Sequence, residues 1–411
     1  MGTGRLPSLL RKVINPLLVA LVLAGPAAGA NKYRVLYAFS GGQDGGTVYG
    51  GVAFDKQGNL YGTTGAGGGY NRGTVFELTP NADGSWTETV IHSFCSEKNC
   101  ADGDDPWAGL VLDPDGNLYG ATQWTLFEMS PSSGGWQFNV VYNGTGSRSL
   151  LLLDKAGNLY GAFGLSKGHG GAISELVRGS DGWKLRTLYA FCIQIPCIDG
   201  DSPNAVIWDP DGNLYGTTQL GGTGKTGDFG TVFELRHSSG GKWTHRVLHS
   251  FQSFQGDGEL LYDTLVRDQA GNLYGTTAQG GKYGCGYVGC GAVFRLSRDS
   301  HGGWKETVLH SFKPGKNGST PIGGVALDKE GNLYGATAGG GIGTCSGGCG
   351  VVFKLTPRSN GVWTYTVVHR FTGQDGANPV AAVTLDEKGN IYGTTWIQGP
   401  AGDGVVFEIT P

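Results

Sequence analysis

Residues 32–39 read KYRVLYAF and are rich in the β-branched and aromatic residues that favour strands. The VLYAF segment resembles TLYAF at residues 187–191, which ends a strand-like run that starts at Trp183. Six such Trp-led runs each follow a turn motif, whereas no motif precedes residues 32–39. At the other end, the chain stops at VFEITP, residues 406–411, one strand short of a full repeat. We therefore expect residues 32–39 to supply the missing strand.

The turn motif DxxGNLYG, with Ile for Leu in the last copy, recurs seven times at spacings of 41 to 60 residues. The copies start at Asp55, Asp113, Asp154, Asp209, Asp268, Asp328 and Asp386. Such periods are typical of propellers, solenoids and arrays. A solenoid gives no reason to divide one unit between the two termini, whereas a closed ring does, because the divided unit locks the ring and protects a strand edge. The sequence thus predicts an all-β fold, a seven-bladed β-propeller over residues 31–411 with the N-terminal strand closing the last blade.

The predicted closure also fixes the order of strands in a blade. The Trp-led strand is outermost, so the strand before each DxxGN motif is innermost. Turns between first and second strands, and between third and fourth strands, then share one face, which we call the turn face. Loops between second and third strands, and the crossovers between blades, share the opposite face, which we call the cysteine face because all eight cysteines fall there.

Residues 1–30 have the layout of a secretory signal peptide, with basic residues, an apolar run over 13–24, and small residues at Ala28 and Ala30. The apolar run is shorter than the roughly 20 residues that a membrane span needs; an uncleaved interfacial anchor is the alternative. Loss of Arg5, Arg11 and Lys12 changes the net charge from −4 to −7. We expect a secreted, periplasmic or surface-located monomer that has no membrane span after signal removal and does not bind nucleic acid.

Two recurring features look like functional motifs but are interpreted as scaffold. DxxGN lacks the later acids of a calcium loop, and no helix follows it to hold a phosphate. Its Asp is expected to accept hydrogen bonds from backbone N–H groups two or three residues on, and its Gly to adopt a positive φ. Four histidines occupy one repeat position in separate blades, so they cannot form one site: His92, His249, His310 and His369.

The eight cysteines form four close pairs in the sequence: Cys95 and Cys100, Cys192 and Cys197, Cys285 and Cys290, and Cys345 and Cys349. In an exported chain, an even number of cysteines indicates disulfides, and pairing within each close pair is the simplest choice. A zinc site built from the last four cysteines is the alternative. The crossovers also carry acidic turns, interpreted as turn chemistry before an inner strand. A calcium ion held by residues 102–105 is the alternative there, and no other cofactor is expected.

A ligand site should lie where the repeat fails, since residues present in every blade hold the blade together. Exposed tryptophan rings suit sugar rings or flat apolar ligands. Two further candidates are a histidine found in only one second-to-third loop, and an arginine in an otherwise aliphatic strand position. The candidate ligand-binding residues are Trp107, Trp124, His169, Trp208, Arg267 and Trp396.

The recurring pattern D..GNLYGTT…GTVFELTP…W…VLHSF…DG..P over residues 32–411 resembles the GloVer tandem-repeat family of exported bacterial proteins, often grouped as choice-of-anchor proteins. The resemblance implies a propeller-like repeat domain at the surface or outside the cell, and it implies no known reaction or catalytic residue. The chain departs from the family by ending at its last strand. The DxxGNLY turn also resembles that of NHL-type propellers and streptogramin lyases.

Two functions remain open. The first is a non-catalytic module that binds an extracellular glycan, peptide or protein on the cysteine face, since rigid loops on a propeller make a recognition surface. The alternative is a metal-dependent propeller enzyme, a lyase or hydrolase, using a histidine or acid on that face.

Overall fold

The computed structural model describes residues 31–144, 146–163, 170–223, 229–238, 240–252, 256–285 and 288–411. Within these ranges the chain is built from β-strands and one short 3-10 helix, η1 (Lys98–Cys100). None of the described helices is long and apolar enough to cross a membrane. The predicted signal peptide, residues 1–30, lies outside the described residues and remains a prediction.

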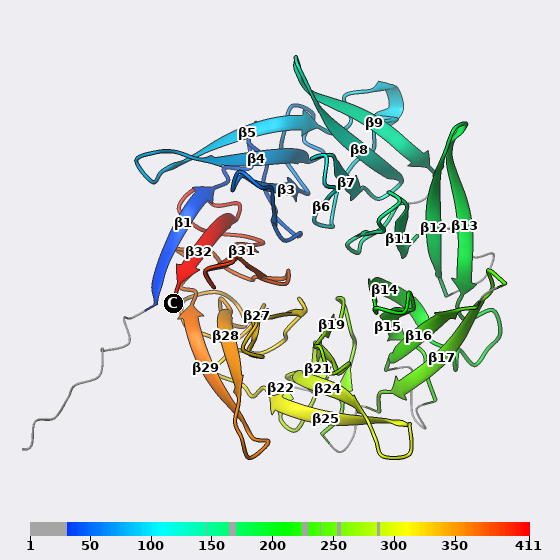
Figure 1. Cartoon of the computed structure of the whole chain (residues 1–411). Coiled ribbons are helices and arrows are strands. Elements are labelled where there is room, and N and C mark those ends of the chain that lie inside the picture. Colours follow the sequence, from blue (N-terminus) through cyan, green and yellow to red (C-terminus); the bar gives the residue numbers. More distant parts are fainter. Residues whose placement is uncertain are drawn as a thin grey trace, which may run out of the picture. The chain divides into compact units, whose positions relative to one another are not determined.

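Seven four-stranded antiparallel sheets form the blades of a β-propeller (Figure 1). The innermost strands are mostly very short: β2 (Ala53–Phe54), β6 (Val111–Leu112), β10 (Leu152–Leu153), β14 (Asp201–Trp208), β19 (Val266–Arg267), β26 (Val325–Leu327) and β30 (Thr384–Leu385). The second strands carry the NLYG segment of each motif: β3 (Leu60–Thr64), β7 (Leu118–Ala121), β11 (Leu159–Ala162), β15 (Leu214–Leu220), β20 (Leu273–Thr277), β27 (Leu333–Thr337) and β31 (Ile391–Thr395). The predicted seven-bladed fold is therefore confirmed.

The third and fourth strands are longer and complete each blade. The third strands are β4 (Thr74–Pro80), β8 (Thr125–Ser132), β12 (Ala172–Gly179), β16 (Thr231–His237), β24 (Ala292–Arg298), β28 (Val351–Pro357) and β32 (Val405–Thr410). The fourth strands are β5 (Trp86–Ser93), β9 (Gly135–Asn143), β13 (Gly182–Ala190), β17 (Trp243–Ser250), β25 (Trp304–Ser311), β29 (Trp363–Arg370) and, in blade 7, β1 (Lys32–Ala38). Two ribbons add to blade 5: β18 (Gly258–Glu259) with β21 (Gln279–Gly280), and β22 (Gly284–Cys285) with β23 (Val288–Gly289).

The first strand of the chain closes the ring, as predicted. β1 pairs antiparallel with β32, from Lys32 opposite Thr410 to Ala38 opposite Val405, and these strands lie side by side in Figure 1. Arg34 forms an ion pair with Glu408 across the two strands at 2.7 Å. Blade 7 is thus built from both ends of the described chain, and β1 pairs the edge that β32 would otherwise expose.

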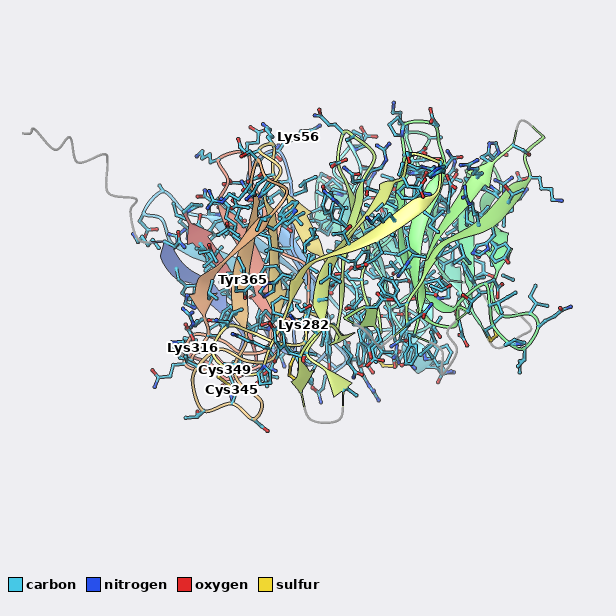
Figure 2. All side chains as sticks on the ribbon, turned by 90° about the horizontal axis from the view of Figure 1, so that it is seen from below. Lys56, Lys282, Lys316, Cys345, Cys349 and Tyr365 are labelled. Carbon is cyan, nitrogen blue, oxygen red and sulfur yellow. A yellow bond between two sulfur atoms is a disulfide. The ribbon has the colours of Figure 1, made fainter. Side chains whose placement is uncertain are left out.

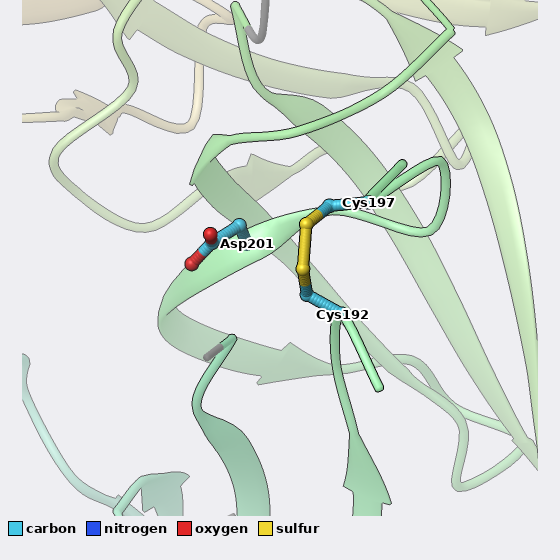
Figure 3. A group of neighbouring side chains, drawn as sticks. All are labelled: Cys192, Cys197 and Asp201. Atoms are coloured by element: carbon cyan, nitrogen blue, oxygen red, sulfur yellow. A yellow bond between two sulfur atoms is a disulfide. The ribbon is translucent and has the colours of Figure 1, made fainter. Parts of the chain in front are cut away.

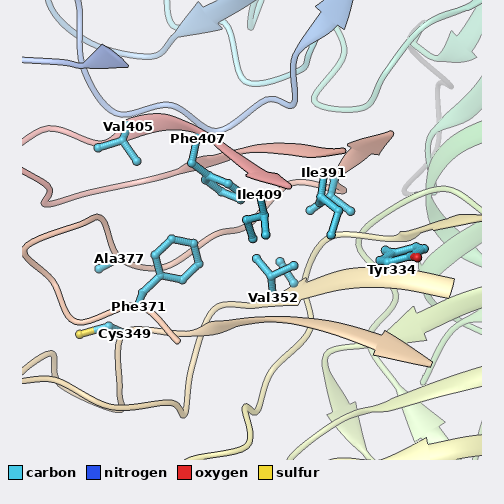
Figure 4. Packing of buried hydrophobic residues seen from close by; sticks show 11 residues of the cluster. Tyr334, Cys349, Val352, Phe371, Ala377, Ile391, Val405, Phe407 and Ile409 are labelled. Carbon is cyan, nitrogen blue, oxygen red and sulfur yellow. The ribbon is translucent and has the colours of Figure 1, made fainter. Parts of the chain in front are cut away.

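The core lies between blades rather than inside any one of them, because each sheet buries both faces against its neighbours. Between blades 6 and 7, Tyr334 and Val352 pack with Ile391 and Phe407 (Figure 4). The aromatic residue of each NLYG segment therefore faces the next blade. This explains why the segment recurs without change of type.

The DxxGN motif is a turn locked by its aspartate. Asp55 Oδ1 accepts hydrogen bonds from the backbone N–H groups of Gln57 and Asn59, at 2.8 and 2.9 Å. Its Oδ2 accepts from Asn59 Nδ2 at 2.7 Å and from the Tyr61 hydroxyl at 3.1 Å. The prediction of a backbone donor two residues after the aspartate is confirmed. The second backbone donor lies four residues after it, because the side-chain amide of Asn59 binds the same carboxylate and holds the Asn59 backbone beside it. Gly58 has φ 90°, as expected for this turn.

Adjacent blades also meet at their outermost strands, and at four of the seams between blades one pair of rings stacks across the contact. His92 stacks on Phe138 with ring centroids 3.9 Å apart. The same contact joins Tyr189 to His245, His310 to Tyr365, and His369 to Tyr33. His92, His310 and His369 thus lie at three separate seams, so the aligned histidines do not form one shared site.

The two faces of the ring carry different loops (Figure 2). Lys56, in the first DxxGN turn, projects at one end of the wall, and Cys345 and Cys349 lie at the opposite end. The cysteine face therefore holds the second-to-third loops and the crossovers, as the strand order predicts.

Candidate ligand-binding site

On the cysteine face, each crossover between blades leads into an innermost strand. Just before that strand, most crossovers contain a residue in the left-handed conformation. In six blades this residue has φ between 48° and 62°: Thr47, Asp105, Ser202, Leu260, Thr320 and Asn378. Its N–H donates to a carbonyl of the preceding blade, as from Thr47 to Asp403 at 2.9 Å and from Asp105 to Arg72 at 3.0 Å. A non-glycine residue in this region is strained, so these bonds fix where each inner strand begins.

The residue six positions before the turn aspartate then lies in the segment that leads into the inner strand. In blades 1, 2 and 3 this position holds Tyr49, Trp107 and Arg148. The corresponding residues of blades 5, 6 and 7 are Tyr262, Ile322 and Val380. The first three blades therefore present two large rings and a guanidinium at consecutive positions around the ring.

These side chains contact one another. Tyr49 stacks on Trp107, with centroids 4.3 Å apart and planes 10° from parallel, and the Arg148 Cζ lies 4.8 Å from the centroid of Trp107. Trp396, from the loop after β31, packs against the other end of the row, 5.3 Å from Tyr49. We call these four residues, from blades 7, 1, 2 and 3, the aromatic arc. Two of the six predicted site residues, Trp107 and Trp396, are thus brought together.

The aromatic arc is partly open and has charged groups beside it. The three rings are half-buried and Arg148 is exposed. Burial raises the pKa of Tyr49, and Asp105 adds to this, whereas Trp396 and Arg148 oppose it. The pKa of Asp105 is raised by burial and by Asp104, and the Arg72 guanidinium, 3.9 Å away, works against this. The arc therefore offers flat apolar faces and a cation, with half-buried carboxylates beside it, within one short stretch of the rim.

The indole nitrogen of Trp396 is buried beside the Tyr49 hydroxyl. Its position influences the pKa of Tyr49, but its geometry falls short of a hydrogen bond with any described residue. A hydrogen bond to a hydroxyl requires the N–H to point at the oxygen. The Trp396 ring therefore contributes its face, rather than its N–H, to this part of the arc.

Trp124 lies on the same face but outside the arc. It sits in the tight turn between β7 and β8, where the N–H of Thr122 donates to the carbonyl of Thr125 at 2.8 Å. Its side chain is 56% exposed, and it makes no ring contact with the arc within the described part of the chain. Gln123, next to it, donates its N–H to the carbonyl of Asp104. This ties the exposed ring to the crossover that carries Trp107.

Trp208 and Arg267 lie at the other end of the innermost strands, next to the turn aspartates. Trp208 packs edge-on to Tyr160, with centroids 4.8 Å apart. Arg267 folds back over its own turn, with Nη1 3.5 Å from the carbonyl of Asp268. The structure therefore does not bring these two residues to the arc. His169 lies outside the described residues.

The cysteines form four local disulfides: Cys95–Cys100, Cys192–Cys197, Cys285–Cys290 and Cys345–Cys349. All eight sulfurs are bonded in pairs, so they offer no thiolate, and the four-cysteine zinc alternative does not fit. Cys192, Cys197 and Asp201 lie within 4.8 Å of one another (Figure 3). Because two of these groups form a disulfide, the cluster leaves a single carboxylate.

A family model described as the Gloeobacter/Verrucomicrobia repeat matches residues 25–174, 123–290 and 285–411. The chain belongs to this repeat family. The resemblance inferred from the motifs is thereby confirmed. No curated protein matches the chain.

Solved structures show the fold of this Gloeobacter/Verrucomicrobia repeat protein but little sequence likeness. The extracellular domain of a putative one component system, BT4673, from B. thetaiotaomicron is 12% identical, with a TM-score of 0.54 over 91% of this chain. The chain covers 39% of that structure's length. A protein from Lactobacillus plantarum is 16% identical, with a TM-score of 0.51, 86% of this chain covered and 99% of that one.

The acidic crossover of this repeat protein does not gather its aspartates around one point. Asp102 accepts hydrogen bonds from the Ser96 N–H and hydroxyl at 3.0 and 2.8 Å, and from the Glu97 N–H at 3.2 Å. It also contacts His92 Nε2 at 3.1 Å. Burial opposes ionisation of Asp102, but these bonds prevail and lower its pKa. The Asp102 carboxylate is therefore already used at the seam between blades 1 and 2, and it is not free to serve as a calcium ligand.

Two members of the aromatic arc, Tyr49 and Arg148, were missed from the sequence. Both sit six residues before a turn aspartate, the position of Trp107 in blade 2. Counting back from DxxGN would have aligned them with Trp107. However, a tyrosine in a variable crossover and an arginine in an unusual one do not stand out in the sequence as site residues. The tryptophans were found because they are rare.

Proposed function

We propose that this repeat protein is a secreted, non-catalytic recognition module that binds a carbohydrate chain on its cysteine face, at the aromatic arc. The observation that carries the proposal is the contact of four symmetry-breaking side chains from four blades. Flat rings stack on the apolar faces of sugars, and the arginine and neighbouring carboxylates suit hydroxyl groups. A peptide or a protein surface is the competing ligand class.

The scaffold supports recognition because it holds the arc without help from a ligand. The crossovers before Tyr49 and Trp107 are fixed by backbone hydrogen bonds to the preceding blades. One disulfide braces the crossover that carries Trp107, and three others brace further loops of the same face. Binding residues on rigidly held loops lose little conformational freedom when a ligand docks.

The enzyme alternative finds no specific support in the described residues. His92 and His369 each contact a crossover aspartate through Nε2, Asp102 at 3.1 Å and Asp375 at 2.9 Å. The one cluster of three potential metal ligands contains a disulfide. Metal analysis of protein purified without chelators would test this alternative directly.

A glycan array screened with the chain over residues 31–411 tests the proposal. We expect Trp107→Ala and Trp396→Ala each to weaken binding at least about tenfold, since buried aromatic anchors dominate such interfaces. Trp124→Ala tests whether the exposed ring extends the site. Trp208→Ala, which removes an indole at the opposite end of a blade, is the matched control. Unchanged binding by both arc variants would rule out the aromatic arc as the site.

A further inference from the structure

The outer seams share a second feature, an aspartate from the crossover. Five crossovers place an aspartate immediately before a glycine: Asp44, Asp102, Asp199, Asp257 and Asp375. Each carboxylate contacts the histidine or tyrosine near the end of the preceding fourth strand, as Asp375 contacts His369 at 2.9 Å. Each also accepts a backbone N–H just after that strand, as from Thr372 at 2.8 Å. We call this residue the seam acid.

The seam between blades 5 and 6 keeps the histidine but lacks the acid. Asn317 occupies the place before the glycine, and its Oδ1 accepts from Arg370 Nη2 at 3.2 Å. His310 stacks on Tyr365 but has no hydrogen-bond partner among the described residues, and neither has the backbone N–H of Lys313. The two groups that the seam acid binds elsewhere are therefore left without an acceptor here. The seam between blades 2 and 3 also lacks an acid, but its crossover includes residue 145, outside the described residues.

A groove of about 840 Å³ opens at this position, a size typical of ligand pockets. It is lined by His310, Lys313 and Asn317, and by Lys282 and Tyr283 from the second-to-third loop of blade 5, among others. We call it the seam groove. Figure 2 shows Lys282 and Lys316 toward the end of the wall that carries Cys345 and Cys349.

The charge of the seam groove is opposite to that of the whole chain. Lys282 and Lys313 line it, and Lys316 and Arg370 flank it on the crossover and on β29. Within the described residues, none of these four cations forms an ion pair with a carboxylate. Burial lowers the pKa of His310 to about 4, and Lys313 acts in the same sense, so the ring is neutral at pH 7 and keeps one N–H to donate.

We propose that the seam groove binds a carboxylate of an acidic sugar chain, which takes the place that the seam acid holds at five other seams. The carboxylate would accept from His310 and from the Lys313 N–H, with the lysine side chains supplying charge. Tyr283, which is 41% exposed, provides a flat face beside Lys282 for a sugar ring. An acidic peptide offers the same carboxylate without a ring to stack, so it is the weaker candidate.

Calorimetric titration of the chain over residues 31–411 with a galacturonic acid trimer tests the proposal. Asn317→Asp places the carboxylate of the other seams next to His310, so we expect it to weaken binding at least tenfold. Lys313→Ala should weaken binding as well. Asn360→Asp makes the same charge change at an exposed hairpin and should bind like the parent chain. Asn317→Asp should unfold at the same temperature as the parent chain or higher, which separates occupancy of the groove from misfolding.

Four results would overturn the assignment. Parent-like binding by Asn317→Asp would show that the vacant acid position is not the site. Equal binding of a neutral galactose trimer would show that no carboxylate is recognised, and tighter binding of a tri-aspartate peptide would show that the ligand is not a sugar. Trp107→Ala should leave the affinity for the acidic trimer unchanged, because the aromatic arc is a separate site. Loss of acidic-trimer binding in that variant alone would assign the ligand to the arc.

Discussion

At the scale of single residues, the aspartate of the turn motif organises every blade. In all seven motifs its Oδ1 accepts the backbone N–H of the motif asparagine, and its Oδ2 accepts that asparagine's side-chain amide. The motif glycines have φ between 80° and 90°. A calcium loop would aim its carboxylates at a shared centre, whereas here both oxygens are used within the turn.

The second blade offers a test within one turn, since DPDGN holds two aspartates. Asp113 accepts three backbone and side-chain hydrogen bonds from Asp115 and Asn117, whereas the Asp115 carboxylate accepts none from the described residues. We expect Asp113→Asn to lower the free energy of unfolding by about 1–3 kcal/mol, because an amide places a donor where these N–H groups need an acceptor. Asp115→Asn should change it by less than about 0.5 kcal/mol. Urea unfolding measures both, and equal effects would contradict the turn assignment.

At the scale of elements, the blades are joined by seams whose chemistry varies from one to the next. Aromatic pairs stack at four seams, whereas Glu88 and Glu306 take the corresponding position at two others, near Tyr37 and His249. Both glutamates have a buried carboxylate oxygen without a hydrogen-bond partner among the described residues. These two seams are therefore the electrostatically costly ones.

Stability should fall with rising pH because of these two residues. Burial raises the pKa of Glu88 to about 7, with Asp44 adding to the effect, and burial raises that of Glu306 to about 7, with Asp257 adding and His249 opposing. Between their ordinary value of 4.5 and about 7 the folded chain holds more protons than the unfolded chain, so each step up in pH favours unfolding.

The double variant Glu88→Gln, Glu306→Gln removes both charges. After allowance for solvent screening of these half-buried groups, we expect it to be about 1–2 kcal/mol more stable than the parent chain at pH 8. At pH 4 the two should be alike, since the glutamates are then protonated in the fold. Thermal or urea unfolding at the two pH values checks this; an equal gain at both would attribute the effect to packing rather than to charge.

The number of blades and their strand order could be predicted because each depends on a local pattern repeated seven times. The seams could not. The histidine position was visible, but its partner lies in the next repeat, two residues after a Trp, and changes identity from Phe138 to His245 to Tyr365. The site was only half predictable for a related reason. Departure from the repeat pattern identifies an unusual residue but not whether it belongs to a site, so Trp208, which directly precedes the turn aspartate Asp209, was grouped with Trp107.

The disulfides act on this element scale as well. Each joins cysteines four or five positions apart, so each closes a very short loop. Loops of this length contribute roughly 2 kcal/mol or less apiece through chain entropy. We expect reduction to lower the melting temperature while leaving the sheet content unchanged, as measured by circular dichroism with and without a reductant. Loss of the sheets on reduction would show that the bridges hold more than their own loops.

At the scale of the whole molecule, the ring depends on one pairing between distant segments. β1 supplies the outermost strand of blade 7, and Phe39 beyond it is fully buried against Phe76 of blade 1. Removing this segment would leave the edge of β32 unpaired and open the core on both sides of blade 7.

A chain that starts at residue 40 tests this closure against one that starts at residue 31. We expect the shorter chain to lose more than about 4 kcal/mol of stability, as large core truncations do, and to self-associate through the free edge of β32. Size-exclusion chromatography and thermal unfolding report the two effects. Equal melting temperatures and a monomeric shorter chain would contradict a closing role for β1.

The pairing of β1 with β32 also determines when, during synthesis of the chain, the ring can close. A ribosome makes residues 32–38 among the first of the fold and residues 405–410 among the last, and blade 7 cannot form its full sheet until both exist. Earlier blades have local partners and can form as they emerge, since domains and sub-domains fold during synthesis. β1 therefore has no strand to pair with while the first six blades are synthesised. The interval before its partner arrives is therefore the period in which this chain is most exposed to misassembly and to the chaperones that prevent it.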